Sequence, residues 1–253
     1  MGQPAASPAI ARFASESRAS KAGRRATVRR FPSAFPGSTR SCREAGWRLG
    51  ALHDVAGGRN GAIDGAAAAL FAAGIAARAK GKVLWCVTRQ DLFAPALAQA
   101  GLLPGRVVYV EAGDEASVLA CFEEGLRHGG LGAVVAELAR LSMTASRRLQ
   151  LAAEASGAIG IAIRRWRRQT EATDFGQPTA AVTRWRVTAL PSRPLPVSGI
   201  GRARWQLELI RVRAGESADF EVEACDDKGR LALFSGLADR SPSARDGPVR
   251  AIG

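Results

Sequence analysis

Lysine, serine and threonine are all missing from His53 to Ala79, a stretch that otherwise has the outline of a nucleotide-binding unit. An apolar segment, a glycine-rich turn and an alanine-rich run follow one another there, which is typical of a strand, a turn and a helix. A phosphate loop of the form GxxxxGK[ST] needs lysine on the terminal phosphates and a hydroxyl on magnesium. Those two positions read Ile63 and Asp64 here. The turn is therefore predicted to lack the chemistry of an ATPase.

This degenerate phosphate loop consists of seven residues at and just before the expected helix start, namely Gly57, Gly58, Arg59, Asn60, Gly61, Asp64 and Gly65. Loss of one charged hydrogen bond to phosphate costs about 1.5–3 kcal/mol, and we expect the acid at the helix start to repel an anionic ligand further. We interpret the glycines as tight packing of a strand on a helix, and we expect no bound cofactor and no catalytic residue. Weak nucleotide binding by backbone amides at the helix start is the alternative.

Metal-binding residues are also scarce, since the chain has four cysteines and two histidines. The cysteines are widely spaced and include no C-x-x-C pair. Zinc sites need closely spaced nitrogen and sulfur ligands, so no metal is expected. Cys86 and Cys121 lie in apolar segments and are predicted to be inert core thiols.

Long apolar runs are absent too. No run approaches the roughly 20 residues of a membrane span, and the first 31 residues lack the apolar centre of a signal peptide. The sequence therefore predicts a cytoplasmic protein without a membrane partner.

Positive charge is what the chain has in excess, with a formal net charge of +13 that comes from two regions. Residues 1–44 carry nine Lys or Arg against two acids, and residues 164–213 carry eleven against three. The first region is rich in Ser, Ala, Pro and Gly without periodicity, and we interpret it as a disordered basic arm rather than a transit peptide. A core domain at 45–238 and a flexible tail at 239–253 complete the predicted organisation.

Apolar periodicity divides the core into alternating strands and helices, followed by strands alone. The strands expected first have near-continuous apolar character, as parallel sheets require, whereas the last three alternate polar and apolar residues and indicate antiparallel strands at the sheet edge. The expected strands are 48–57, 82–88, 106–113, a strand ending on Glu137, 158–163, 180–190, 204–215 and 219–226, and the expected helices are 62–79, 91–101, 115–129 and 142–156. Trp185 and Trp205 fall on alternation positions and are predicted to be core or cross-strand partners.

Several extended phrases carry a family resemblance. "GALHDVAGG", "AAAALFAAGIAARAKGKVLWCV", "VVYVEAGDEASVLACFEEGLRH" and "LARLSMTASRRLQLAAEASG" resemble the ImuA family, the RecA-like proteins of bacterial damage-inducible mutagenesis cassettes. The resemblance covers about residues 45 to 240 and implies an α/β fold, a RecA-like parallel sheet flanked by helices and extended by antiparallel strands. The lead-in "FPSAFPGSTRSCREAGW" departs from the family pattern and favours disorder before Ala45.

Comparison with active RecA-like enzymes identifies further departures. The glutamate that acts on the attacking water would fall near Arg89, and an arginine is not a base at neutral pH. Glu137 keeps an acid where a magnesium-supporting aspartate is usual. With lysine, hydroxyl and base all missing, we predict that the protein is not an enzyme.

A cluster of arginines around one tryptophan follows the strand at 158–163, where the RecA comparison implies a DNA-contacting loop. Its members are Arg164, Arg165, Trp166, Arg167 and Arg168. Guanidinium groups bind phosphates and an aromatic ring stacks on bases, so the cluster is expected to be exposed and to contact DNA or a partner. In the alternative, Trp166 anchors the loop to the core and the arginines solvate its end.

The ImuA resemblance implies a non-catalytic adaptor in SOS-inducible translesion DNA synthesis. Its implied partners are a Y-family-polymerase-like protein and an error-prone C-family polymerase, with RecA and DNA as further candidates. A division inhibitor resembling SulA, which caps a tubulin-like protein, is the competing hypothesis, and an ATP-dependent recombinase is disfavoured by the missing lysine. The positively charged loop favours the adaptor, because a capping protein needs a shape-matched apolar face.

Overall fold

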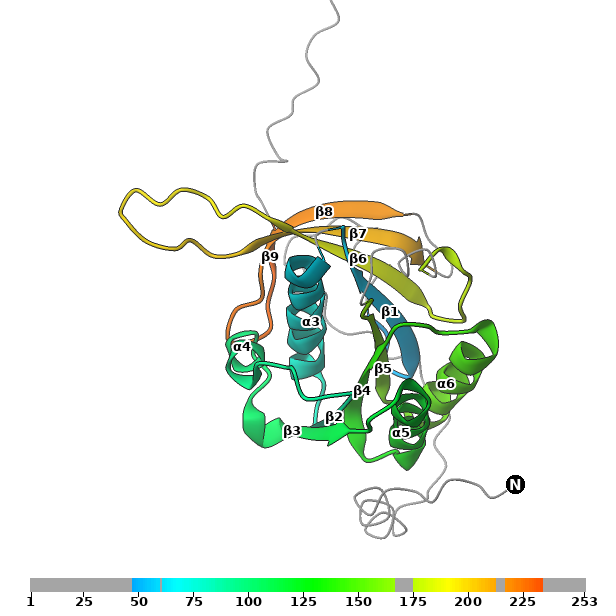
Figure 1. The fold of residues 1–253 in the computed structure, drawn as a ribbon. Coiled ribbons are helices and arrows are strands. Elements are labelled where there is room, and N and C mark those ends of the chain that lie inside the picture. The colour runs from blue at the N-terminus through cyan, green and yellow to red at the C-terminus, as the bar shows by residue number, and fades with distance from the viewer. Residues whose placement is uncertain (1–46, 60, 167–174, 213–216, 234–253) are drawn as a thin grey trace, which may run out of the picture.

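One mixed sheet of nine strands runs through the part of the chain that the computed structural model describes, residues 47–59, 61–166, 175–212 and 217–233 (Figure 1). The strands are β1 (Ala51–Gly57), β2 (Lys82–Val87), β3 (Val107–Glu111), β4 (Leu131–Leu138), β5 (Ile159–Arg164), β6 (Thr183–Leu190), β7 (Arg204–Val212), β8 (Ala218–Glu223) and β9 (Ala232–Leu233). The helices are α3 (Gly61–Arg78), α4 (Ala94–Gln99), the short 3-10 helix η1 (Pro104–Arg106), α5 (Glu115–His128) and α6 (Met143–Ser156). The expectations for residues 1–44 and 239–253 lie outside the described residues.

The strand order is β3-β2-β4-β5-β1-β6-β7-β8-β9. The six strands from β3 to β6 are parallel to their neighbours, and β7, β8 and β9 continue the sheet as antiparallel strands. The predicted fold class, a parallel sheet between helices with an antiparallel extension, is thereby confirmed. The strand expected at 180–190 as antiparallel is antiparallel only to β7, because on its other side it pairs in parallel with β1, as His53 opposite Thr183 shows. Its polar and apolar alternation comes from having only one face covered by a helix, and is not a sign of strand direction.

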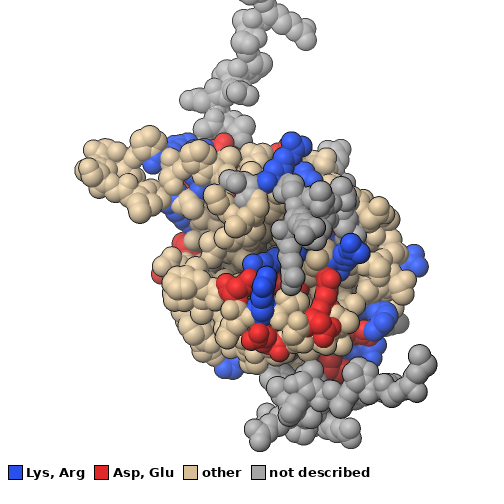
Figure 2. Space-filling model, in the orientation of Figure 1, with Lys and Arg blue, Asp and Glu red and all other residues tan. Residues whose placement is uncertain are grey.

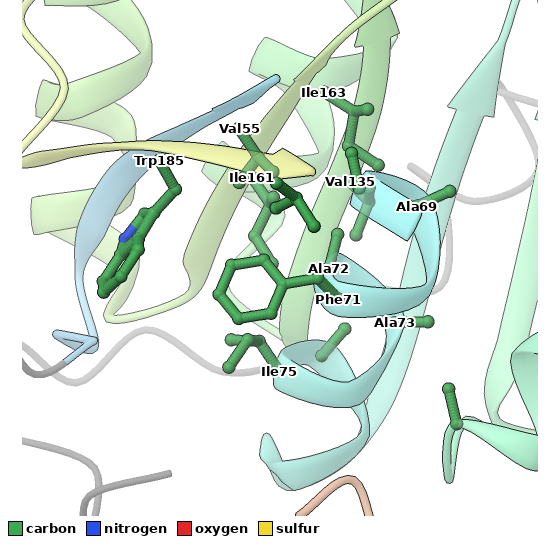
Figure 3. Close-up of a cluster of buried hydrophobic side chains, with 14 of the residues drawn as sticks. Val55, Ala69, Phe71, Ala72, Ala73, Ile75, Val135, Ile161, Ile163 and Trp185 are labelled. Carbon is green, nitrogen blue, oxygen red and sulfur yellow. The ribbon is translucent and has the colours of Figure 1, made fainter. Parts of the chain in front are cut away.

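Helices cover the two faces of the sheet and create two apolar cores (Figure 1). On the α3 face, Phe71 packs edge-on against Trp185 at a centroid distance of 5.7 Å and lies near Ile161 and Val135 (Figure 3). Trp205 is buried in the same cluster, which confirms the core prediction for both tryptophans. On the opposite face, α5 and α6 pack against β1, β2, β4 and β5.

Local signals in the sequence account for the ends of α5 and α6. The Asp114 side chain accepts a hydrogen bond from the Ser117 amide at 2.9 Å, and the Ser142 hydroxyl accepts one from the Ala145 amide. Each cap satisfies an amide that has no partner within the helix. Gly129, the residue that follows α5, has a left-handed backbone with φ of 74°, a conformation that glycine adopts without a Cβ penalty.

Helix α3 is the one described helix that is long and apolar enough to cross a membrane, by length and composition only. It contacts β1, β4, β5 and β6, and 56% of its 18 residues are buried inside the protein. Its uniform alanine-rich character is accounted for by this central position in the core.

Candidate functional site

A cavity of about 1100 Å³ opens where the parallel strands end at their carboxyl termini. Its walls come from the start of α3, from the ends of β4 and β5, and from the segments after β2 and β3. In α/β sheets this edge is where ligands bind. Figure 2 shows acidic and basic side chains gathered beside one another on the displayed face.

Two glycines of the turn, Gly57 and Gly58, pack too closely for any larger side chain. A Cβ on Gly57 would lie 2.8 Å from the Asp64 carbonyl carbon, and one on Gly58 would collide with the Thr188 hydroxyl. The Gly58 amide also donates a hydrogen bond to the Val187 carbonyl oxygen at 2.9 Å. These contacts pack Gly57 and Gly58 against α3 and β6, as inferred, whereas a Cβ on Gly61 or Gly65 would meet no atom within 4 Å.

Among the other residues of the degenerate loop, Gly61 and Gly65 line the cavity. Arg59 and Gly61 are exposed, Gly65 is half-buried, and Asn60 lies outside the described residues. Ile63, at the position of the phosphate-binding lysine, is 58% exposed. The cation of this loop, Arg59, is not among the described residues that line the cavity.

Asp64 departs from our expectation, because its carboxylate does not face the cavity as a repelling charge. The side chain is buried, and Oδ1 accepts a hydrogen bond from the Ala189 amide at 2.8 Å. Where a magnesium-binding hydroxyl is needed, the chain instead has a carboxylate that fastens α3 to β6. Helical periodicity could not predict this hydrogen bond, because Ala189 lies 125 residues later in the sequence.

Glu137 stands at the end of β4 as predicted, but it already has two partners. Trp85 Nε1 donates to its Oε1 at 3.0 Å, and Arg165 Nη1 lies 2.6 Å from its Oε2. Burial raises the pKa of the Glu137 carboxyl, and the Arg165 guanidinium opposes that rise. The acid that could have supported a metal ion is paired with a guanidinium of the same chain.

Arg165 makes a second ion pair across the cavity. Its Nη1 and Nη2 donate to the two carboxylate oxygens of Asp91 at 2.8 and 3.0 Å. A bidentate pair of this kind fixes both position and orientation. Arg165 thereby joins the end of β5 to the end of β4 and to the segment after β2.

Arg164 corrects the prediction that the arginine cluster is exposed. Its side chain is fully buried, and its Nε donates to Asp54 Oδ1 at 2.9 Å. Arg184 Nε lies 3.3 Å from the other oxygen of Asp54, so two buried guanidiniums flank one buried carboxylate. The prediction failed because side chains alternate along a strand, and position 164 is the last residue of β5, facing Asp54 on β1.

Trp166 follows the anchoring alternative and not base stacking. Its Nε1 donates to the Ala139 carbonyl oxygen at 3.1 Å, and its ring lies edge-on to Phe175 at 5.9 Å. Arg167 and Arg168 lie outside the described residues. The part of the cluster that the structure describes is therefore occupied with contacts inside the protein.

Sequence reasoning missed Asp54 and Asp91, the acids that neutralise the arginines. A carboxylate inside a buried strand is rare unless it is paired, so Asp54 within "ALHDVAG" was the available signal. Asp91 had no such signal, because it lies in a polar segment after β2.

Within the described residues no group of three His, Cys, Asp or Glu side chains is placed to hold a metal ion. Cys86 and Cys121 are buried, and burial raises the pKa of both thiols.

No protein-family profile matches the chain. Protein ImuA of Caulobacter vibrioides, strain NA1000 / CB15N, is 36% identical over 226 residues, which span 84% of this chain and 88% of that protein. Protein ImuA of strain ATCC 19089 / CIP 103742 / CB 15 matches to the same extent. The chain belongs to the ImuA family. The family predicted from the extended phrases is thereby confirmed.

Among solved structures, the RadB recombinase matches with a TM-score of 0.48 and 17% sequence identity. The match covers 75% of this ImuA chain and 93% of RadB.

Proposed function

We propose that this ImuA chain is a non-catalytic RecA-fold adaptor in SOS-inducible, error-prone translesion DNA synthesis. In this proposal it works with a Y-family-polymerase-like protein and an error-prone C-family polymerase, and it contributes surfaces rather than chemistry. Family membership supports the pathway, and the geometry at the carboxyl edge of the sheet supports the missing catalysis.

The pairing of Arg165 with Glu137 and Asp91 is the observation that carries the proposal. A nucleotide-hydrolysing site needs an acid available for magnesium and a cation available for phosphate. Here the acid at the end of β4, Glu137, is bonded to Arg165 of the same cavity at 2.6 Å. Opening that pair for a ligand would leave the buried Glu137 carboxylate without its charged partner, which is costly.

The same contacts move the proposed role away from direct DNA binding by the arginine cluster. Arg164 is buried against Asp54, and Arg165 is committed to two acids. Phosphate contacts need exposed guanidiniums. RecA and DNA remain proposed as partners, and protein contacts form the centre of the adaptor's role.

ATP turnover by the purified protein directly tests whether the protein lacks catalytic activity. We expect no turnover above background, with or without single-stranded DNA, for the wild type. Glu137→Gln keeps a hydrogen-bond acceptor for Trp85 and removes the acid, so it serves as the matched control. Turnover by the wild type that disappears in Glu137→Gln would refute the non-catalytic role.

Damage-induced mutagenesis in cells tests the pathway. Deleting the gene should abolish it, and expression of either the wild type or Glu137→Gln should restore it in full, because the adaptor does not use the acid. Normal mutagenesis in the deletion strain would refute the role in translesion synthesis.

A further inference from the structure

The connection between β6 and β7 projects from the body as a long arm, residues 191–203, drawn in yellow in Figure 1. All ten residues from Pro191 to Ile200 are exposed. A segment of this length that is exposed throughout gains little from the core. Its presence calls for a role outside the fold.

The base of the arm is nevertheless held firmly. Arg202 Nη1 lies 3.3 Å from Glu223 Oε2, and its Nη2 donates to the Arg230 carbonyl oxygen at 3.1 Å. Arg204 Nη1 donates to the Pro191 carbonyl oxygen at 3.2 Å and ties the two limbs together where they leave the sheet. The arm therefore leaves the body in a defined direction.

The two limbs of the arm also lie against each other. A Cβ on Gly201 would lie 2.8 Å from the Arg193 carbonyl oxygen, and one on Gly199 would lie 3.3 Å from Leu195 Cδ1. Prolines at 191, 194 and 196 restrict the first limb, because the pyrrolidine ring fixes φ. A segment shaped before binding loses less conformational entropy on binding.

Apolar side chains cover the outer part of the arm. Leu195 is 45% exposed, Val197 70% and Ile200 97%. These are three of the eight large apolar side chains that are exposed in the described part of the chain. Their concentration on one projecting segment marks an interaction surface, because single exposed apolar residues are normally scattered.

We propose that this arm is a docking element that inserts into an apolar, aromatic-lined groove with an acidic rim on a partner protein. Proline-rich extended segments dock in aromatic-lined grooves because their shape is preformed. Residues 191–203 contain two arginines and no acidic residue, so the arm carries net positive charge, which fits an acidic rim. The inference rests on the proposed function, in which the partner is the Y-family-polymerase-like protein.

The test replaces the three exposed aliphatic side chains by Leu195→Ser, Val197→Ser and Ile200→Ser together. The purified Y-family-polymerase-like protein of the same organism is the probe, and its Kd is measured by calorimetry. We expect binding at least about tenfold weaker in the triple variant. The thermal midpoint should be unchanged, because the side chains are exposed.

Leu151→Ser is the matched control, because Leu151 is 64% exposed on α6, away from the arm. It should bind like the wild type. Equal binding by the triple variant and the wild type would overturn the arm proposal alone. A wild type without affinity for the polymerase-like protein would overturn the proposed function and the arm proposal together.

Two other occupants give distinct results with the same variants. If the arm served a second copy of the chain, the triple variant would lose self-association in sedimentation and keep the polymerase-like partner. If it served DNA, the variant would lose affinity for a single-stranded oligonucleotide instead. Either pattern would overturn the proposal.

Discussion

Arg164 Nε lies 2.9 Å from Asp54 Oδ1, and both side chains are fully buried. Arg184 Nε approaches the second oxygen of Asp54 at 3.3 Å, so one carboxylate lies between two guanidiniums from β5 and β6. Arg184 also lies over the Phe175 ring, 4.4 Å from its centroid, and donates to the Gln177 carbonyl oxygen. The cluster holds the segment before β6 against the sheet.

Asp54→Asn should destabilise the protein more than Arg164→Gln. The first change leaves two buried guanidiniums without their shared carboxylate, whereas the second leaves the Asp54 carboxylate paired with Arg184. Removing one partner of a buried pair costs about 3–5 kcal/mol, and urea unfolding measures the loss. Arg186→Gln is the control on the same strand, where the pair with Glu208 is partly exposed and is expected to contribute under about 1 kcal/mol. An Arg164→Gln variant as stable as this control would contradict the prediction.

Arg165→Gln should lower the free energy of unfolding by about 1–3 kcal/mol, because the buried Glu137 carboxylate keeps only the Trp85 hydrogen bond. Adding Glu137→Gln should recover part of the loss, and urea unfolding of both single variants and the double variant measures the coupling. Burial already raises the pKa of Glu137, and removing Arg165 raises it further. The deficit of Arg165→Gln should therefore shrink as the pH falls and the carboxyl becomes protonated. A deficit independent of both Glu137 and pH would contradict this account.

Restoring the letters of the phosphate loop by Ile63→Lys and Asp64→Thr should not create an ATPase. The double variant should instead unfold more easily, by about 1–3 kcal/mol, because the half-buried Ala189 amide loses its acceptor. Ile63→Lys alone should change stability by less than about 0.5 kcal/mol, since the side chain is exposed. ATP turnover in the double variant would show that the rest of the site is still competent.

His53 should make the protein acid-sensitive. The ring is buried between Trp47 and Thr183, and burial lowers its pKa from 6.5 to about 4. The folded state therefore holds His53 neutral, so stability is complete above pH 6.5 and falls as the pH drops from 6.5 towards 4, by on the order of 3 kcal/mol. His53→Gln keeps a polar group for Thr183 but does not titrate. Relative to the variant, the wild type should lose stability as the pH falls from 6.5 towards 4. A difference in stability that does not change with pH would contradict the role of His53.

The sequence by itself determined the elements and their class. Apolar periodicity placed every helix from α3 to α6 and strands β1 to β8 within a few residues, because burial on one or two faces leaves its period in the chain. It also determined the loss of the phosphate-binding lysine and hydroxyl, since these are identities at two positions, Ile63 and Asp64. The family followed from extended phrases, which no short motif could have replaced.

Only the tertiary structure decided what the charged residues do. Arg164 reads like the other arginines of the cluster in the sequence, yet its side chain is bonded to Asp54, 110 residues earlier. Asp64 binds the Ala189 amide, and Arg165 pairs with Glu137, 28 residues earlier, and with Asp91, 74 residues earlier. The direction of β6 was likewise decided by its pairing with β1. Local periodicity predicts which positions are buried, but it does not identify a partner that is distant in the sequence. A charged side chain can be buried only where such a partner is present.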